Sequence, residues 1–165
     1  MLKAPGDTTE RISRAQLRTE RIKTLGHRQP IMVSTGTSLA GAIATMQAND
    51  GEPILITDGG RLLGVLTERD VLLKVLGREE SLDASVDEVM TRDPHTLTAD
   101  STVGEALELM ESGRYRTVPL VDETGAPAGL LRQQDIVEYV AEAFPQEILN
   151  LPPRPHQVME EQEGA

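Results

Sequence analysis

The chain contains no cysteine and no tryptophan, and only three of its 165 residues are aromatic. Without cysteine there is no disulfide framework, no thiolate metal site and no cysteine nucleophile. With so few rings, the hydrophobic core must be built from aliphatic side chains. No apolar run approaches the roughly 20 residues that span a bilayer, and the N-terminal stretch lacks the apolar segment of a signal peptide. We therefore expect a soluble, cytoplasmic protein with no membrane partner.

Positive charge is also scarce, because the formal net charge is −11. A balance this acidic argues against non-specific nucleic-acid binding, which depends on basic surface. Residues 1–28 are the exception, with seven Lys or Arg against three acids, a net of +4 that leaves −15 for the rest. A capping pattern predicts a helix from Asp7 to Gly26. We expect this basic helix to be solvated; the alternative is that it docks on an acidic face.

One stretch of the chain occurs twice. Residues 64–70 read GVLTERD, and residues 129–135, 65 positions downstream, read GLLRQQD. The same order of elements precedes both copies, which indicates a tandem duplication. A single repeat of about 65 residues is marginally stable alone, so we expect the two copies to pack on each other.

Hydrophobic periodicity and turn residues predict the order strand–helix–strand–strand–helix in each copy. The predicted fold class is therefore α/β, with two small sheets. The segment boundaries that we expect are an N-terminal basic helix and linker at 1–29, repeat one at 30–78, a bridge at 79–93, repeat two at 94–143 and a Pro/Glu-rich tail at 144–165.

Asp70 and Asp135 each stand where a strand gives way to a helix. One interpretation is local: Thr67 and Asp70 form a capping box at the helix start. Arg132, at the matching position of the second copy, cannot accept a hydrogen bond and so cannot cap. The other interpretation is a nucleotide site, because an aspartate can accept from both cis hydroxyls of a ribose while helix N–H groups bind phosphate. Flanking strand residues would then hold a base: Ile54, Ile56, Val65, Val118, Leu120 and Leu130.

These motifs, in this order and at this spacing, resemble a tandem pair of cystathionine-β-synthase (CBS) domains, often called a Bateman module, over about residues 30–142. The resemblance also rests on the lead-in at 86–94 and on the run RTVPLVD at 116–122. It implies two repeats packed with pseudo-two-fold symmetry, two clefts between them and adenosine-containing ligands such as AMP, ADP, ATP or S-adenosylmethionine. A homodimer is also implied.

Carried over by position, the resemblance assigns ribose hydroxyls to Asp70 and Asp135, and a ribose or phosphate contact to Thr67. Thr96 matches a threonine that ends the first strand of ligand-binding repeats, and Arg116 matches a basic residue before the second strand.

Neither repeat holds the full set of these residues. Repeat one has Met32 in place of Thr96 and Glu52 in place of Arg116, and repeat two has Arg132 where the pattern has Ser or Thr. Arginines suit phosphate oxygens, so Arg114, Arg116 and Arg132 make repeat two the side that favours phosphate, unless acids nearby or solvent engage them. We expect one occupied site.

The sequence supports a regulatory module that senses an adenine nucleotide, without a tightly bound cofactor, and signals to an unidentified protein partner. A ligand-free dimerisation scaffold, in which Asp70 and Asp135 only start helices, is the alternative; a sensor of S-adenosylmethionine or Mg²⁺ is a further one. Catalysis is not expected, because no nucleophile–base or acid pair has recognisable spacing. The three histidines lie too far apart for a metal site.

Overall fold

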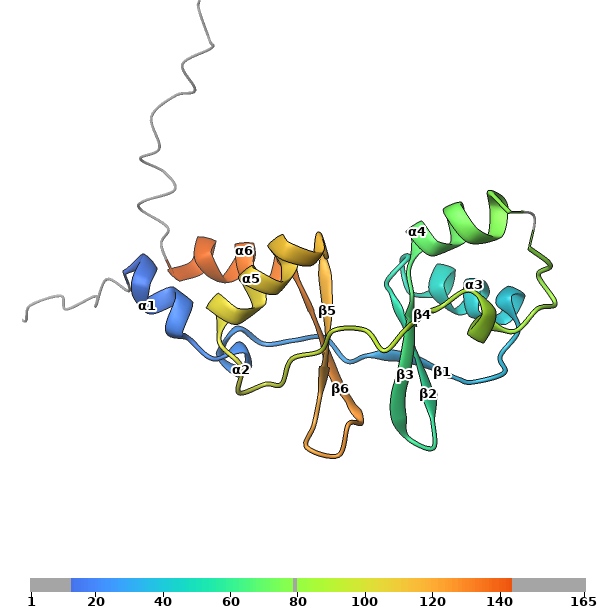
Figure 1. The fold of residues 1–165 in the computed structure, drawn as a ribbon. Helices are drawn as coiled ribbons and strands as arrows, with labels where there is room; N and C mark the ends of the chain where they lie inside the picture. Colours follow the sequence, from blue (N-terminus) through green and yellow to red (C-terminus); the bar gives the residue numbers. More distant parts are fainter. Residues whose placement is uncertain (1–12, 79, 144–165) are drawn as a thin grey trace, which may run out of the picture.

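The computed structural model describes residues 13–78 and 80–143. It contains two α/β units side by side, with the two sheets next to each other at the centre and the helices on the outer sides (Figure 1). None of the described helices is both long and apolar enough to cross a bilayer.

Repeat one forms a sheet of four strands in the order β1-β2-β3-β4, in which β1 runs parallel to β2 and the other pairs are antiparallel. Its own elements are β1 (Ile31–Ser34), α3 (Leu39–Ala48), β2 (Ile54–Asp58), β3 (Arg61–Leu66), α4 (Glu68–Asp70) and the π-helix η1 (Val71–Leu76). Ser38 caps α3 by accepting from the N–H of Gly41 at 3.1 Å. The hairpin turns at Gly59 and Gly60, both with positive φ, which glycine adopts at no steric cost.

Repeat two has the same order of elements as repeat one, but its first strand is reduced to a single bridge. The bridge and repeat two contain the 3₁₀ turn η2 (Val86–Glu88), β4 (Thr91–Arg92), α5 (Val103–Gly113), β5 (Thr117–Val121), β6 (Pro127–Arg132) and α6 (Gln133–Ala143). The strand expected near Thr96 is present only as one parallel bridge, between Leu97 and Leu120. Its counterpart in repeat one is the pairing of Val33 with Ile56, 64 positions earlier in both residues.

The segment that precedes each repeat packs into the other repeat. Ile22, before repeat one, is fully buried in the repeat-two core, and Val86, before repeat two, is fully buried in the repeat-one core. The hydrogen bonds repeat in the same way: Val86 N–H donates to the Thr37 carbonyl at 2.8 Å, and Ile22 N–H donates to the Ser101 carbonyl at 2.9 Å. These pairs are 64 positions apart, so the two halves are related by internal pseudo-two-fold symmetry.

The basic N-terminal helix is not continuous. Within its described part there are two short helices, α1 (Arg14–Thr19) and α2 (Ile22–Leu25), and the predicted start at Asp7 lies outside the described residues. The chain is extended at Glu20, whose carbonyl accepts from Val103 N–H at 2.9 Å. Pairing with repeat two therefore replaces the helical hydrogen bonds at this point.

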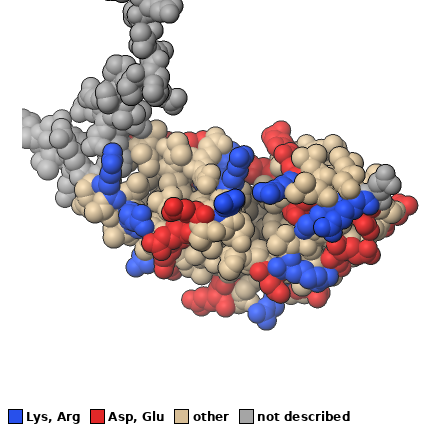
Figure 2. Space-filling view, turned by 45° about the horizontal axis from the view of Figure 1, so that its top comes forward, with Lys and Arg blue, Asp and Glu red and all other residues tan. Residues whose placement is uncertain are grey.

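Basic side chains of this segment form ion pairs with repeat two of the same chain. Arg18 pairs with Glu108 at 3.0 Å and Lys23 with Asp100 at 2.6 Å. Of the two possibilities, docking on acidic residues is the one observed. All four side chains are more than half exposed, so each pair contributes little, and the burial of Ile22 anchors the segment. Over the face drawn in Figure 2, Lys/Arg and Asp/Glu side chains are interspersed.

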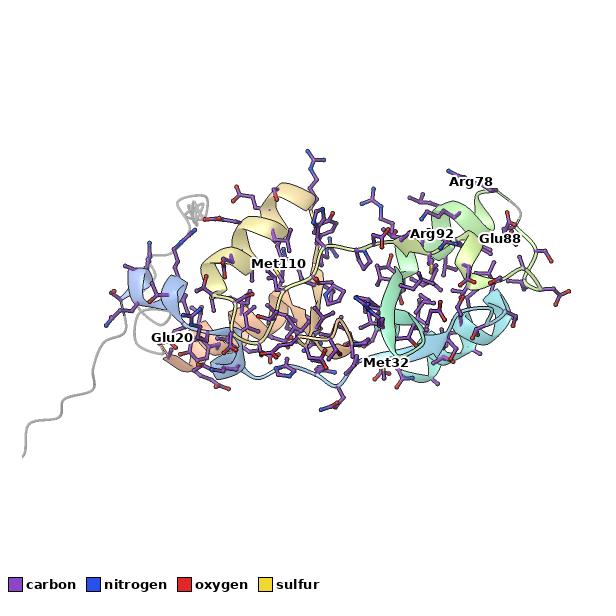
Figure 3. All side chains as sticks on the ribbon, turned by 60° about the horizontal axis from the view of Figure 1, so that its bottom comes forward. Glu20, Met32, Arg78, Glu88, Arg92 and Met110 are labelled. Carbon is purple, nitrogen blue, oxygen red and sulfur yellow. The ribbon has the colours of Figure 1, made fainter. Side chains whose placement is uncertain are left out.

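Each repeat has its own aliphatic core. The repeat-one core contains Leu39, Ala42, Met46, Ile54, Ile56, Leu66, Val75, Val86, Val89 and Met90. The repeat-two core contains Ile22, Val103, Ala106, Met110, Val118, Leu120, Leu131 and Ile136. Met110 points into this second core in Figure 3. Neither core includes an aromatic ring, as the composition predicts.

We expect Ile22→Ala to destabilise the protein by about 2–5 kcal/mol, because it leaves a cavity in the repeat-two core. Urea denaturation measures the change. Arg14→Ala, at an exposed position of α1, is the control and should change little. An equal, small effect of both substitutions would mean that the N-terminal segment does not stabilise repeat two.

Candidate ligand clefts between the repeats

The surface between the repeats is built from the sheet faces that turn away from the helices. Leu55 on β2 pairs with Val65 on β3, and Pro119 on β5 pairs with Leu130 on β6. Leu55 is fully buried although it lies outside both core clusters. At the hairpin ends, Leu62 N–H donates to the Gly125 carbonyl at 3.0 Å. The two sheets therefore meet through alternate residues of these strands.

This alternation corrects the predicted base pocket. Ile54 and Ile56 belong to the repeat-one core, and Val118 and Leu120 belong to the repeat-two core, with at most 1% of each side chain exposed. Successive side chains of a strand point to opposite faces, so these four cannot line the space between the sheets. Val65 and Leu130 of the predicted set lie on the sheet faces that turn toward the other repeat, together with their strand partners Leu55 and Pro119.

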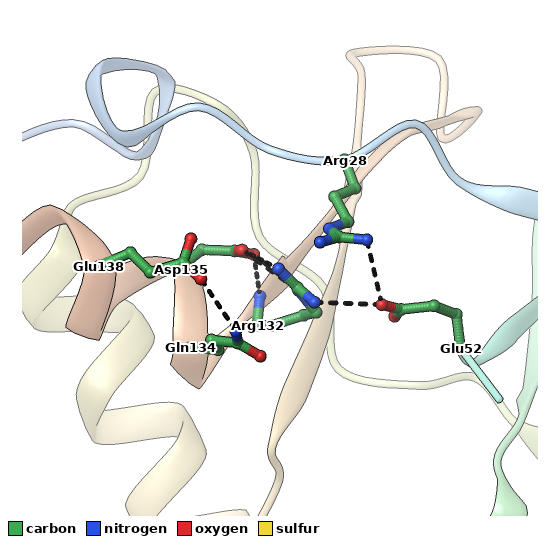
Figure 4. Close-up of polar contacts among 6 residues, drawn as sticks. All are labelled: Arg28, Glu52, Arg132, Gln134, Asp135 and Glu138. Atoms are coloured by element: carbon green, nitrogen blue, oxygen red, sulfur yellow. Dashed lines mark hydrogen bonds and ion pairs between the residues drawn. The ribbon is translucent and has the colours of Figure 1, made fainter. Parts of the chain in front are cut away.

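A network of ion pairs crosses between the repeats beside Asp135 (Figure 4). The Arg132 guanidinium donates through Nε to Asp135 Oδ1 at 3.1 Å and through Nη1 to Glu52 Oε1 at 3.1 Å. Arg28 lies 3.5 Å from the same Glu52 oxygen. The side chains of Arg132, Asp135 and Glu52 are only 14%, 11% and 17% exposed. The hydrogen bonds that Arg132 donates to Asp135, with the negative charges of Asp135 and Glu52, raise the pKa of Arg132.

Two hollows adjoin this network. One, of about 280 Å³, is lined by Arg28, Arg132 and Asp135 of the network together with Leu25, Gly26, His27, Glu138, Tyr139 and Glu142. The other, of about 330 Å³, lies beside β1 and is lined by Arg28, Gln29, Ile31, Ala48, Asn49, Asp50, Glu52 and Leu130. Arg28 borders both hollows.

Asp70, in the other copy of the motif, has a different environment. It forms the predicted capping box: its Oδ2 accepts from Thr67 N–H at 2.9 Å and from Thr67 Oγ1 at 2.8 Å. Its Oδ1 pairs with Lys74 Nζ at 2.8 Å, and Lys74 also donates to the Val89 carbonyl at 2.9 Å. The Asp70 side chain is 12% exposed. Here the cation comes from the same helix, one turn on, and does not cross to the other repeat.

Internal symmetry shows which residues share a cleft. Glu52 of repeat one contacts Arg132 of repeat two. Arg116 lies 64 positions after Glu52 and is its equivalent in repeat two. Thr67 lies 65 positions before Arg132 and is its equivalent in repeat one. Each cleft therefore contains residues of both repeats, whereas we predicted from the sequence one set of ligand-binding residues within each repeat.

By this equivalence we expect Thr67 and Asp70 to share a cleft with Arg116. Thr96 is equivalent to Met32, which is 50% exposed, and neither residue lines one of the two hollows described above. Arg114 and Arg116 are exposed. Arg114 ends α5 in the left-handed conformation, with φ 54°.

Three charged residues of these clefts were not predicted as site residues. Arg28 was assigned to a linker, Glu52 was noted only as a departure from the pattern, and Lys74 was not singled out. Comparing the two copies position by position points to Glu52, because it stands opposite Arg116. No comparable signal marks Arg28 or Lys74. Within the described residues, no group of three or more His, Cys, Asp or Glu is arranged to hold a metal ion.

Two intertwined repeats with polar clefts between them define a tandem-repeat α/β module. The family model of the CBS domain matches residues 22–77 and 86–142. The chain belongs to the CBS domain family.

Known relatives and solved structures agree with this assignment. The chain is 36% identical over 104 residues to the meiotically up-regulated gene 70 protein of Schizosaccharomyces pombe; the match covers 62% of this chain and only 14% of that protein's length. The CBS-domain containing protein ATU1752 of Agrobacterium tumefaciens is 32% identical with a TM-score of 0.65, covering 73% of this chain and 98% of that chain.

Two further solved structures share the fold. They are the CBS domain protein PAE2072 of Pyrobaculum aerophilum in complex with AMP (22% identity, TM-score 0.66, covering 74% of this chain and 99% of that one) and the CBS domain pair of protein MJ0100 in complex with 5-methylthioadenosine and S-adenosyl-L-methionine (24% identity, TM-score 0.66, covering 73% and 98%).

We expect Glu52→Gln to lower the free energy of unfolding by about 1–3 kcal/mol, because it removes the negative charge from a little-exposed acceptor of hydrogen bonds from Arg132. Urea denaturation provides the measurement. Glu108→Gln, which breaks a pair exposed by 54% and 73%, is the matched control and should have little effect. If both variants behave alike, the network at Glu52 does not hold the repeats together.

Proposed function

We propose that the chain is a regulatory module that binds an adenine nucleotide of the AMP, ADP or ATP class at the Asp70 cleft. The observation that carries this proposal is the charge at equivalent positions. Glu52 contacts Arg132 beside Asp135, and in the symmetry-related cleft of Thr67 and Asp70 the position equivalent to Glu52 is Arg116. A cleft with one aspartate and nearby arginines suits a molecule that carries both ribose hydroxyls and phosphate.

Each residue of the proposed site has a role that follows from its chemistry. Asp70 accepts from a ribose hydroxyl, because its Oδ1 has a lone pair beyond the one that Lys74 uses. Thr67 and Thr96 contact ribose or phosphate through their hydroxyl groups. Arg114 and Arg116 bind phosphate oxygens, and Val65 faces the base.

The solved structures of the same fold support the ligand class. PAE2072 was crystallised with AMP, and MJ0100 with 5-methylthioadenosine and S-adenosyl-L-methionine, all of which contain adenosine. For this chain, S-adenosylmethionine is a further candidate ligand, and Mg²⁺ is another. We propose regulation without catalysis, in the cytoplasm, in which the adenylate level sets the state that a protein partner reads. That coupling requires the ligand to bind one arrangement of the repeats more tightly than another.

Thermal unfolding with AMP, ADP, ATP, S-adenosylmethionine and Mg²⁺ in turn tests the proposal. A nucleotide at about 100 times its dissociation constant adds about 2.7 kcal/mol of stability, which raises the melting temperature of a domain of this size by several degrees. Asp70→Asn should abolish that shift, and Asp135→Asn should preserve it.

Both variants remove one carboxylate at equivalent positions, so each is the matched control of the other. A shift that survives in Asp70→Asn and disappears in Asp135→Asn would place the nucleotide in the other cleft. No shift with any of the five compounds would leave the scaffold as the function.

The scaffold alternative also has an observation in its favour. Leu72, Leu73 and Leu76 on the π-helix η1 are 60%, 57% and 66% exposed, and Val137, equivalent to Leu72, is 65% exposed. Exposed apolar clusters mark interaction surfaces. We propose that this surface supports a homodimer, in which the exposed leucines of one copy are covered by the other.

We expect the double substitution Leu72→Glu with Leu76→Glu to convert a dimer to a monomer, because it places like charges in the apolar contact. Sedimentation velocity measures the assembly state. Leu82→Glu, at a position that is 51% exposed in the bridge, should leave it unchanged. A wild-type protein that sediments as a monomer at high concentration would contradict the dimer.

A further inference from the structure

Arg132 replaces a short hydroxyl side chain in the repeated motif. At the equivalent position of repeat one, the Thr67 hydroxyl bonds to Asp70, within its own turn. The longer Arg132 side chain bonds Asp135 in the same way and then continues across to Glu52 of the other repeat. Its guanidinium therefore lies in the space between the two sides of the Asp135 cleft (Figure 4).

The bonding capacity of Asp135 is mostly used by this one residue. Its Oδ2 accepts from the Arg132 backbone N–H at 2.8 Å and from Nε at 3.3 Å. Its Oδ1 accepts from Nε and from Nη2, which fills both lone pairs of that oxygen. A ribose at Asp135 would have to displace the guanidinium, which is only 14% exposed.

The Arg132 side chain limits the size of the hollow at Asp135. That hollow has a volume of about 280 Å³, at the low end of the roughly 300–1,000 Å³ that is typical of ligand pockets. Arg132 and Asp135 both line it. Removing the Arg132 side chain would therefore enlarge the hollow beside Asp135, where a ribose would have to lie.

Charge also opposes a phosphate at this cleft. A phosphate that bound Arg132 would have to replace two carboxylates that already hold it, and the charge of Glu138 also acts on the same guanidinium. The acids Asp135, Glu52 and Glu138 would then surround the incoming anion. Like charges in a poorly solvated site repel strongly.

We propose that the Arg132 side chain occupies the Asp135 cleft in place of a nucleotide. Each chain therefore binds one nucleotide. Arg132 is thus a specificity-determining residue that acts by exclusion. The inference rests on the proposed function for the single occupied cleft, but the exclusion itself is a property of Arg132, Asp135 and Glu52.

The test is the double variant Arg132→Thr with Glu52→Gln, which keeps the net charge and restores the threonine found at position 67. Titration calorimetry with AMP and with ATP should give one site in the wild type and two in the double variant. Adding Asp70→Asn to the double variant should return the count to one. The pair Arg18→Thr with Glu108→Gln makes the same two changes at an exposed ion pair and should leave one site.

Two sites in the wild type, or one site in a folded double variant, would overturn the proposal. A crystal structure of the double variant gives a readout that does not need the nucleotide: an enlarged cavity beside Asp135 is expected, and a hollow of unchanged size would overturn the proposal. If the wild type binds neither AMP nor ATP and the double variant has the enlarged cavity, the proposed function is refuted and the exclusion by Arg132 is supported.

Discussion

The structure depends on the exchange of lead-in segments between the two repeats. Ile22 completes the core of repeat two and Val86 completes the core of repeat one. Separating the repeats would expose both side chains, at a cost of the order of 1.5–3 kcal/mol for each. The exchange also places the residues that follow each lead-in on the sheet of the other repeat: β4 pairs with β3, and Arg28 pairs with Leu130. Each cleft is therefore built by both repeats.

The two clefts are related by backbone symmetry, but their side chains at equivalent positions differ in charge. The positions of Glu52 and Arg116 are equivalent, and so are those of Arg132 and Thr67. In the Asp135 cleft these positions hold Glu52 and Arg132, which form an ion pair between the repeats. In the other, Thr67 donates to Asp70 within its own turn, and Arg116 is the residue equivalent to Glu52. Two duplicated sites can thus differ in function while their backbone hydrogen bonds are the same.

The helix that begins at Asp70 connects the proposed ligand to the rest of repeat one. Lys74 joins the Asp70 carboxylate to the carbonyl of Val89, in the segment that crosses to repeat two. The same helix continues as η1 and exposes its leucines. π-helical turns occur often at functional sites. A ligand that competes with Lys74 for Asp70 would therefore act on the crossing segment and on the apolar surface through one element.

The sequence by itself determined the duplication, the order of strands and helices, and the capping box at Thr67 and Asp70, because these follow from short-range periodicity and local hydrogen bonding. Strand bounds such as Thr117–Val121 follow from the same local signals. Only the tertiary structure decided which face of β2 and β5 looks into a core, because a run of apolar residues such as 54–56 does not reveal its inner side. The tertiary structure also brought Glu52 to Arg132, 80 residues apart. That contact depends on the exchange of lead-in segments, which no local pattern encodes.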